Sequence, residues 1–167
     1  PYTTLFRSVI MGDKSHTFAH EQGGLAALGG VVPHTIPNQP DGTLLLEDIE
    51  SAIRRDDPHN PRSRLVNLEN THNACNGTPI TPDYVARVAA LVHGHGLKVH
   101  VDGARIFNAA VALGVEAGEL VRDVDSVTFC LSKGLSAPVG SVICGSEDFI
   151  NEALRGRKVL GGGMRQA

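Results

Sequence analysis

Two predicted strand ends carry the residue types best suited to chemistry. One apolar run ends in His100-Val101-Asp102-Gly103-Ala104-Arg105, and another ends in Phe129-Cys130-Leu131-Ser132-Lys133-Gly134. Ligands of open α/β sheets bind at the carboxyl ends of the strands. We therefore expect the Asp102 carboxylate and the Lys133 amine to face a common ligand.

An acid held against a pyridinium nitrogen and a lysine able to form a Schiff base are the two groups that pyridoxal phosphate requires. Asp102 and Lys133 supply that pair, and Arg105 could hold a carboxylate through two hydrogen bonds. Taken singly, Asp102 could be a helix cap and Lys133 a solvated lysine. The apolar run before Lys133 and the small residues after it favour an amine that points into a cleft.

Composition excludes several other classes. The net charge of −3 and the lack of a basic stretch argue against a nucleic-acid partner, and no apolar run reaches the about 18 residues of a membrane span. The three cysteines show no CxxC spacing, which is typical of reduced thiols in a cytoplasmic compartment. The eight histidines fit no zinc pattern, so no metal site is expected, and the GxGxxG dinucleotide signature is absent.

Apolar runs alternate with helical segments, which predicts βαβ units and a mostly parallel sheet with flanking helices in the α/β class. Pro33 places strand 31–36 at an edge, and Thr81 followed by Pro82 marks a helix start. The remaining predicted strands are 9–11, 65–69, 97–101, 126–131 and 142–144, and the predicted helices are 17–28, 46–55, 81–92, 104–113 and 147–157.

The first eight residues resemble the translation of a sequencing-adapter oligonucleotide. We expect residues 1–8 to be non-native and residues 9–167 to belong to one domain, or to part of one.

Six segments together resemble the low-specificity L-threonine aldolases, which are fold-type I pyridoxal-phosphate enzymes. They are Ser15-His16, Leu68-Glu69-Asn70-Thr71-His72-Asn73, the stretch from His100 to Asn108, the stretch from Cys130 to Leu135, the stretch from Ala137 to Ser141, and Leu160 to Ala167. The resemblance implies the large domain of an aspartate aminotransferase-like fold. It also implies that residues 9–167 are its central part, without the N-terminal segment and the small C-terminal domain.

The resemblance also implies roles for individual residues. Lys133 is similar to the Schiff-base lysine, Asp102 to the partner of the pyridine nitrogen, and His16 to the histidine that stacks on the cofactor ring. His72 resembles the residue near the substrate β-hydroxyl, where either it or an ordered water is the base. Arg105 resembles the arginine that binds the substrate carboxylate, and Arg165 matches a basic position near the phosphate.

The implied activity is that of an aldehyde-lyase that cleaves L-threonine and L-allo-threonine to glycine and acetaldehyde by a retro-aldol step through an external aldimine. The full-length protein is expected to be a cytoplasmic homotetramer acting on a small amino acid, and the piece alone to be inactive. Another fold-type I lyase, an aminotransferase, or a non-enzymatic binding protein on the same scaffold remain alternatives. His20 stands where the family carries a large aromatic residue, and residues 74–77 replace its usual arginine and paired glycines.

Overall fold

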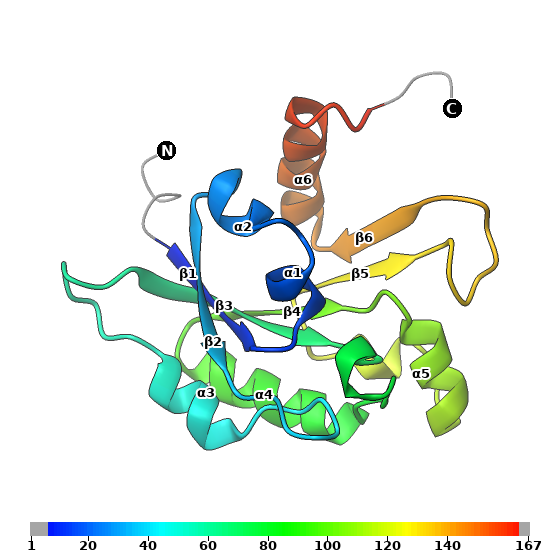
Figure 1. Ribbon diagram of the computed structural model, residues 1–167, viewed down its shortest axis with the longest axis horizontal. Coiled ribbons are helices and arrows are strands. Elements are labelled where there is room, and N and C mark those ends of the chain that lie inside the picture. The colour runs from blue at the N-terminus through cyan, green and yellow to red at the C-terminus, as the bar shows by residue number, and fades with distance from the viewer. Residues whose placement is uncertain (1–6, 164–167) are drawn as a thin grey trace.

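A six-stranded sheet organises the part of the chain that the computed structural model describes, residues 7–163 (Figure 1). Its strand order is β2-β1-β3-β4-β5-β6, in which neighbouring strands among β1–β5 are parallel and β6 is antiparallel to β5. The predicted mostly parallel α/β architecture is confirmed. The strands are Arg7–Gly12 (β1), Val31–Ile36 (β2), Arg62–Glu69 (β3), Lys98–Asp102 (β4), Ser126–Cys130 (β5) and Ser141–Gly145 (β6).

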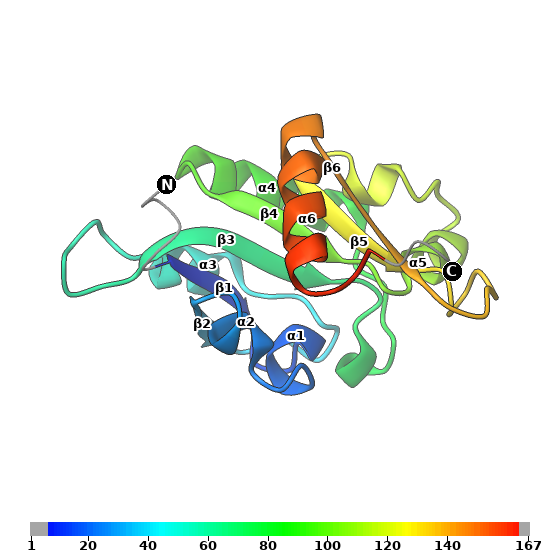
Figure 2. The ribbon, with the colours of Figure 1, turned by 90° about the horizontal axis from the view of Figure 1, so that it is seen from above.

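Helices lie on both faces of the sheet. α3 and α4 cover one face, and α2 and α6 lie over the other (Figures 1 and 2). The α-helices are His16–Ala19 (α1), Gly24–Ala27 (α2), Leu46–Ala52 (α3), Pro82–Gly94 (α4), Ile106–Leu113 (α5) and Glu147–Val159 (α6), with 3-10 turns at Asn73–Cys75 and Glu119–Val121.

Two predicted helices differ clearly in extent from those in the structure. The single helix expected over 17–28 is wrong, because Gln22 and Gly23 take positive φ values of 52° and 67° and separate α1 from α2. The helix expected over 46–55 ends at Ala52, since Ile53 is extended. The edge position of β2 is confirmed, and its Pro33 pairs with β1 alone.

The predicted non-native segment is described only at its end. Residues 1–6 lie outside the described residues, whereas Arg7 and Ser8 are the first residues of β1. Ser8 is buried and lies in register with both β2 and β3.

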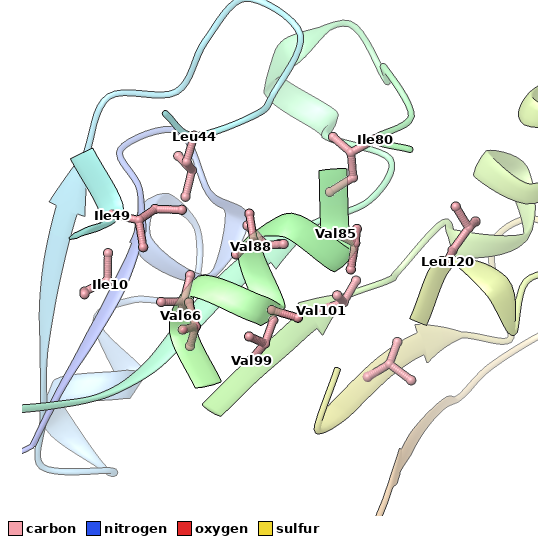
Figure 3. Close-up of a cluster of buried hydrophobic side chains, with 14 of the residues drawn as sticks. Ile10, Leu44, Ile49, Val66, Ile80, Val85, Val88, Val99, Val101 and Leu120 are labelled. Atoms are coloured by element: carbon pink, nitrogen blue, oxygen red, sulfur yellow. The ribbon is translucent and has the colours of Figure 1, made fainter. Parts of the chain in front are cut away.

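The alternation of side chains along β4 separates the core from the opposite face of the sheet. Val99 and Val101 are fully buried in the cluster formed with α4, as Figure 3 shows. His100 and Asp102, at the intervening positions, point to the other face. One strand therefore supplies packing on one side and polar groups on the other.

The start of α4 is capped as the sequence predicts. Thr81 has an extended backbone, and its side-chain oxygen accepts a hydrogen bond from the N–H of Tyr84 at 3.3 Å, with Pro82 at the first helical position. Threonine at this position satisfies a backbone donor that the helix itself leaves unpaired.

We expect Thr81→Ala to lower the free energy of unfolding of the full-length protein by about 1 kcal/mol, because this cap is lost. Thr81→Ser keeps the hydroxyl and should stay close to wild type. Urea unfolding of both variants checks this, and equal losses in the two would show that the hydroxyl cap does not act.

Candidate active site at the carboxyl edge of the sheet

The strand order reverses between β1 and β3. From β1 the chain continues to β2 on one side, and it returns to β3 on the other side. A reversal of this kind opens a crevice at the carboxyl ends of the two strands, where ligands of α/β sheets bind. His16 follows β1 and His72 follows β3, so the sheet topology brings these predicted site residues to the same crevice.

Glu69, the last residue of β3, connects the two segments that carry these histidines. Its side chain is only 5% exposed. Oε2 accepts a hydrogen bond from the backbone N–H of His16 at 2.8 Å, and Oε1 accepts one from the N–H of Asn73 at 2.9 Å. Glu69 belongs to the motif Leu68–Asn73, but the sequence predicted no role for it. The available signal was an acidic residue ending an otherwise apolar strand.

The His72 imidazole is enclosed, and its ring nitrogens are unpaired. Its side chain is 1% exposed, and neither ring nitrogen has a hydrogen-bond partner among the described residues. Nε2 lies 3.9 Å from Oε2 of Glu69, beyond hydrogen-bond distance. A buried donor or acceptor without a partner costs about 1–3 kcal/mol. The described residues therefore leave both ring nitrogens of His72 unsatisfied.

Backbone contacts hold the His72 loop in place. The N–H of His72 donates to the carbonyl of Thr78 at 3.1 Å, and Asn70 exchanges two side-chain hydrogen bonds with the backbone of Ile80, each at 3.1 Å. Gly42 packs directly against Cβ of His72.

The loop 37–45, which contains Gly42, is held by the Tyr84 hydroxyl. This hydroxyl accepts a hydrogen bond from the N–H of Leu44 and donates one to the carbonyl of Leu44. Burial raises the pKa of Tyr84 to about 12.

Asp102 lies in the same row of the sheet as Glu69. The register pairs Glu69 with Asp102 and Asp102 with Thr128, so polar side chains at the ends of β3 and β4 lie in one row with Thr128, in the middle of β5. Oδ1 of Asp102 accepts a hydrogen bond from the N–H of Ala104 at 3.1 Å, which is a local turn contact. The helix-cap alternative for Asp102 is wrong, because α5 begins at Ile106 and Arg105 stands at its cap position. A turn contact at one oxygen leaves the second carboxylate oxygen for a ligand.

A hollow of about 720 Å³ opens above Asp102, a volume that suits a small cofactor. His100 also faces it, and its Nδ1 lies 2.8 Å from the Ser126 hydroxyl. Burial lowers the pKa of His100, and the Asp102 carboxylate opposes this only in part. The walls come from β4, β5, α6 and the segment of α1 and α2, through Thr17, Glu21, Gly24, Leu25, Leu28, Gly29, Thr128, Gly156, Val159 and Leu160.

His16 lies beside this hollow, half exposed at the start of α1. Its Nε2 is 3.1 Å from Oε1 of Glu21, and its ring centroid is 5.2 Å from that of His20. Thr17 and Glu21, close to His16 in the chain, line the hollow. His20, the position that departs from the family pattern, is therefore a direct neighbour of a predicted cofactor-contacting residue.

Lys133 lies at the same edge of the sheet but is not enclosed. Residues 132–136 of the β5–β6 connection are all exposed, so within residues 7–163 the prediction that the Lys133 amine points into a cleft is wrong. Figure 1 shows this connection extending away from the end of β5. Arg105 is half buried immediately before α5, and Arg165 lies outside the described residues.

The family follows from comparison with known proteins. The model of the beta-eliminating lyase family matches residues 2–167. The chain belongs to the beta-eliminating lyases. It is 52% identical over 162 residues to low-specificity L-threonine aldolase 1 of Arabidopsis thaliana, and the alignment covers 95% of this chain and 45% of that protein. It is 46% identical over 158 residues to the low specificity L-threonine aldolase of Escherichia coli K12, with 95% of this chain and 46% of that protein covered.

A solved structure agrees with these relatives. Threonine aldolase of Leishmania major has a TM-score of 0.79 and 27% identity, over 93% of this chain and 45% of that one. The resemblance inferred from the motifs is thereby confirmed, together with the fold class. The chain spans less than half the length of the relatives it matches.

Neither a metal-binding cluster nor a membrane-spanning helix occurs among the described residues. Among residues 7–163, no three His, Cys, Asp or Glu side chains gather where they could hold a metal ion. No helix in this part of the chain is both long and apolar enough to cross a membrane.

Two glycines with left-handed backbones test the packing of His72. A Cβ at Gly42 (φ +87°) would lie 2.6 Å from Cβ of His72, whereas one at Gly77 (φ +68°) would meet nothing closer than Thr71 Oγ1 at 4.0 Å. We expect Gly77→Ala to lose about 1–2 kcal/mol of stability from backbone strain, and Gly42→Ala to lose about 1–3 kcal/mol more from overpacking. Denaturant unfolding of the two full-length variants measures the difference, and equal losses would contradict the contact.

Proposed function

We propose that the full-length protein containing this chain is a pyridoxal-phosphate-dependent L-threonine aldolase. It would cleave L-threonine and L-allo-threonine to glycine and acetaldehyde. The observation that carries the proposal is the placement of Asp102 in the hollow, in register with Glu69 and beside the segment of His16. The names of the relatives from Arabidopsis thaliana and Escherichia coli support this choice of reaction.

The described residues fit the ring end of the cofactor. The free carboxylate oxygen of Asp102 would hold the pyridine nitrogen, the His16 imidazole would lie against the ring, and the Lys133 amine would form the covalent link. Arg165 would pair with the phosphate. When bound, pyridoxal phosphate supplies an electron sink for the carbanion left when the Cα–Cβ bond breaks.

The side chains of the chain itself would bind and orient the amino acid. Arg105 would hold the substrate carboxylate in a bidentate, charge-assisted contact. His72, whose ring nitrogens have no partner among the described residues, would accept the β-hydroxyl proton, either directly or through a water. Burial of this ring keeps bulk water away from the nitrogen that receives the proton.

We further propose that residues 9–167 are the central part of the large domain, and that a cytoplasmic homotetramer is the working form. In that assembly, other parts of the full-length protein would enclose Lys133. This agrees with the share of each relative that the chain spans, 45–46%. The piece by itself should not turn over substrate.

The covalent link is tested by reducing the full-length protein with borohydride after adding pyridoxal phosphate, followed by peptide mapping. The cofactor mass should lie on Lys133, it should be absent from Lys133→Ala, and it should persist in Lys98→Ala. Lys98 is a suitable control because it pairs with Asp125 at the opposite end of β4. Label on another lysine, or none, would sink the cofactor assignment.

The reaction is tested by measuring acetaldehyde from L-threonine and L-allo-threonine with the same preparations. Wild type should release it, and Lys133→Ala should lose at least about a thousandfold in kcat, in line with loss of a covalent catalyst. Amino-group transfer without aldehyde would instead favour an aminotransferase. A protein that takes no cofactor label on any lysine and releases no aldehyde would favour a non-enzymatic binding role.

A further inference from the structure

The Glu69 carboxylate connects the two segments that carry the predicted catalytic histidines, His16 and His72. His16 follows β1 and His72 follows β3, 56 positions later in the chain. Glu69 reaches both, because its two oxygens accept hydrogen bonds from the N–H of His16 and from the N–H of Asn73, next to His72. The same Oε2 atom lies 3.9 Å from Nε2 of His72.

A carboxylate is the side chain that suits this position. An ionised carboxylate has two oxygens and only accepts hydrogen bonds, so it can serve two backbone donors at once. A glutamine in the same place offers one oxygen, and its NH₂ group would face the other N–H donor. An aspartate is one methylene shorter and could reach one donor only.

We propose that Glu69 is the positioning residue that sets the place of His72 relative to His16. The inference rests on the proposed function for the roles of the two histidines. Glu69 itself need not touch the substrate. Its buried carboxylate fixes the backbone at His16 and at Asn73, next to His72, and so links the segments that follow the paired strands β1 and β3.

The two substrates offer a sensitive readout of this geometry. L-Threonine and L-allo-threonine differ in the orientation of the β-hydroxyl, the group that His72 is proposed to face. A shift of His72 relative to His16 should therefore change the two rates by different factors, since displacements of about 1 Å can cost about 100-fold. A simple loss of folded protein lowers both rates equally and leaves their ratio unchanged.

Asp125 provides a matched control. It is also a partly buried carboxylate that joins elements far apart in the chain, accepting hydrogen bonds from the N–H of Val99 and from Lys98, with Nε2 of His93 at 2.8 Å. It lies at the amino end of β4, away from the proposed site. Asp125→Asn should disturb structure without changing substrate discrimination.

The first measurement uses amide hydrogen exchange of the cofactor-free, full-length protein. In Glu69→Gln, peptides containing His16 and Asn73 should exchange faster, while peptides of α4 should match wild type. In Asp125→Asn, faster exchange should be confined to peptides around Val99. Unchanged exchange at both His16 and Asn73 in Glu69→Gln would overturn the proposal, and Glu69→Asp gives a second test if the glutamine variant does not fold.

The second measurement is the ratio of kcat/KM for L-threonine to that for L-allo-threonine. We expect Glu69→Gln to lower kcat about 10- to 100-fold and to change this ratio at least about threefold, and Asp125→Asn to leave the ratio unchanged. An unaltered ratio in active Glu69→Gln would refute the positioning role. If wild type releases no aldehyde, the proposed reaction fails, whereas the exchange result still decides whether Glu69 holds the two segments.

Discussion

The backbone hydrogen bonds that continue the sheet beyond the ends of β3 and β4 fix the positions of Glu69 and Asp102. The N–H of Asn70 donates to the carbonyl of Asp102, and the N–H of Gly103 donates to the carbonyl of Thr128, each at 2.8 Å. The ladder thus continues one residue beyond β3 and β4. This keeps Glu69, Asp102 and Thr128 in one row, so the row does not depend on the loops that follow it.

The sheet separates stability from chemistry through its two faces. Valines of β3 and β4 pack against α4 on one face, where they are fully buried. On the other face the same strands present Asn67, His100 and Asp102, with Glu69 at the strand end. Because side chains alternate with a period of two, a change on the polar face leaves the packed face in place. The polar residues of the site can therefore be substituted without changing the packing of the valines in the core.

Local signals in the sequence were enough to predict the class of the fold and several of its details. The edge strand followed from Pro33, the start of α4 from Thr81 and Pro82, and the strand end at Asp102 from a short apolar run. Each of these depends on residues within a few positions of one another. The family motifs added His16 and His72, which the sheet topology then brought to one crevice.

Features set by distant contacts could not be predicted in this way. The role of Glu69 depends on a hydrogen bond to His16, 53 positions earlier, which no local pattern encodes. The break between α1 and α2 depends on left-handed backbone at Gln22 and Gly23, and glutamine gives little sign of that conformation. Lys133 is exposed because no described residue covers this part of the β5–β6 connection, and the local sequence does not specify which distant segments pack there.

A crystal structure of the full-length protein grown with pyridoxal phosphate tests the central claim most directly. The account predicts electron density continuous from the Lys133 Nζ atom to the cofactor. It also predicts a pyridine nitrogen about 3 Å from a carboxylate oxygen of Asp102 and the ring beside His16. A cofactor joined to another lysine, or one whose ring nitrogen lies away from Asp102, would contradict it.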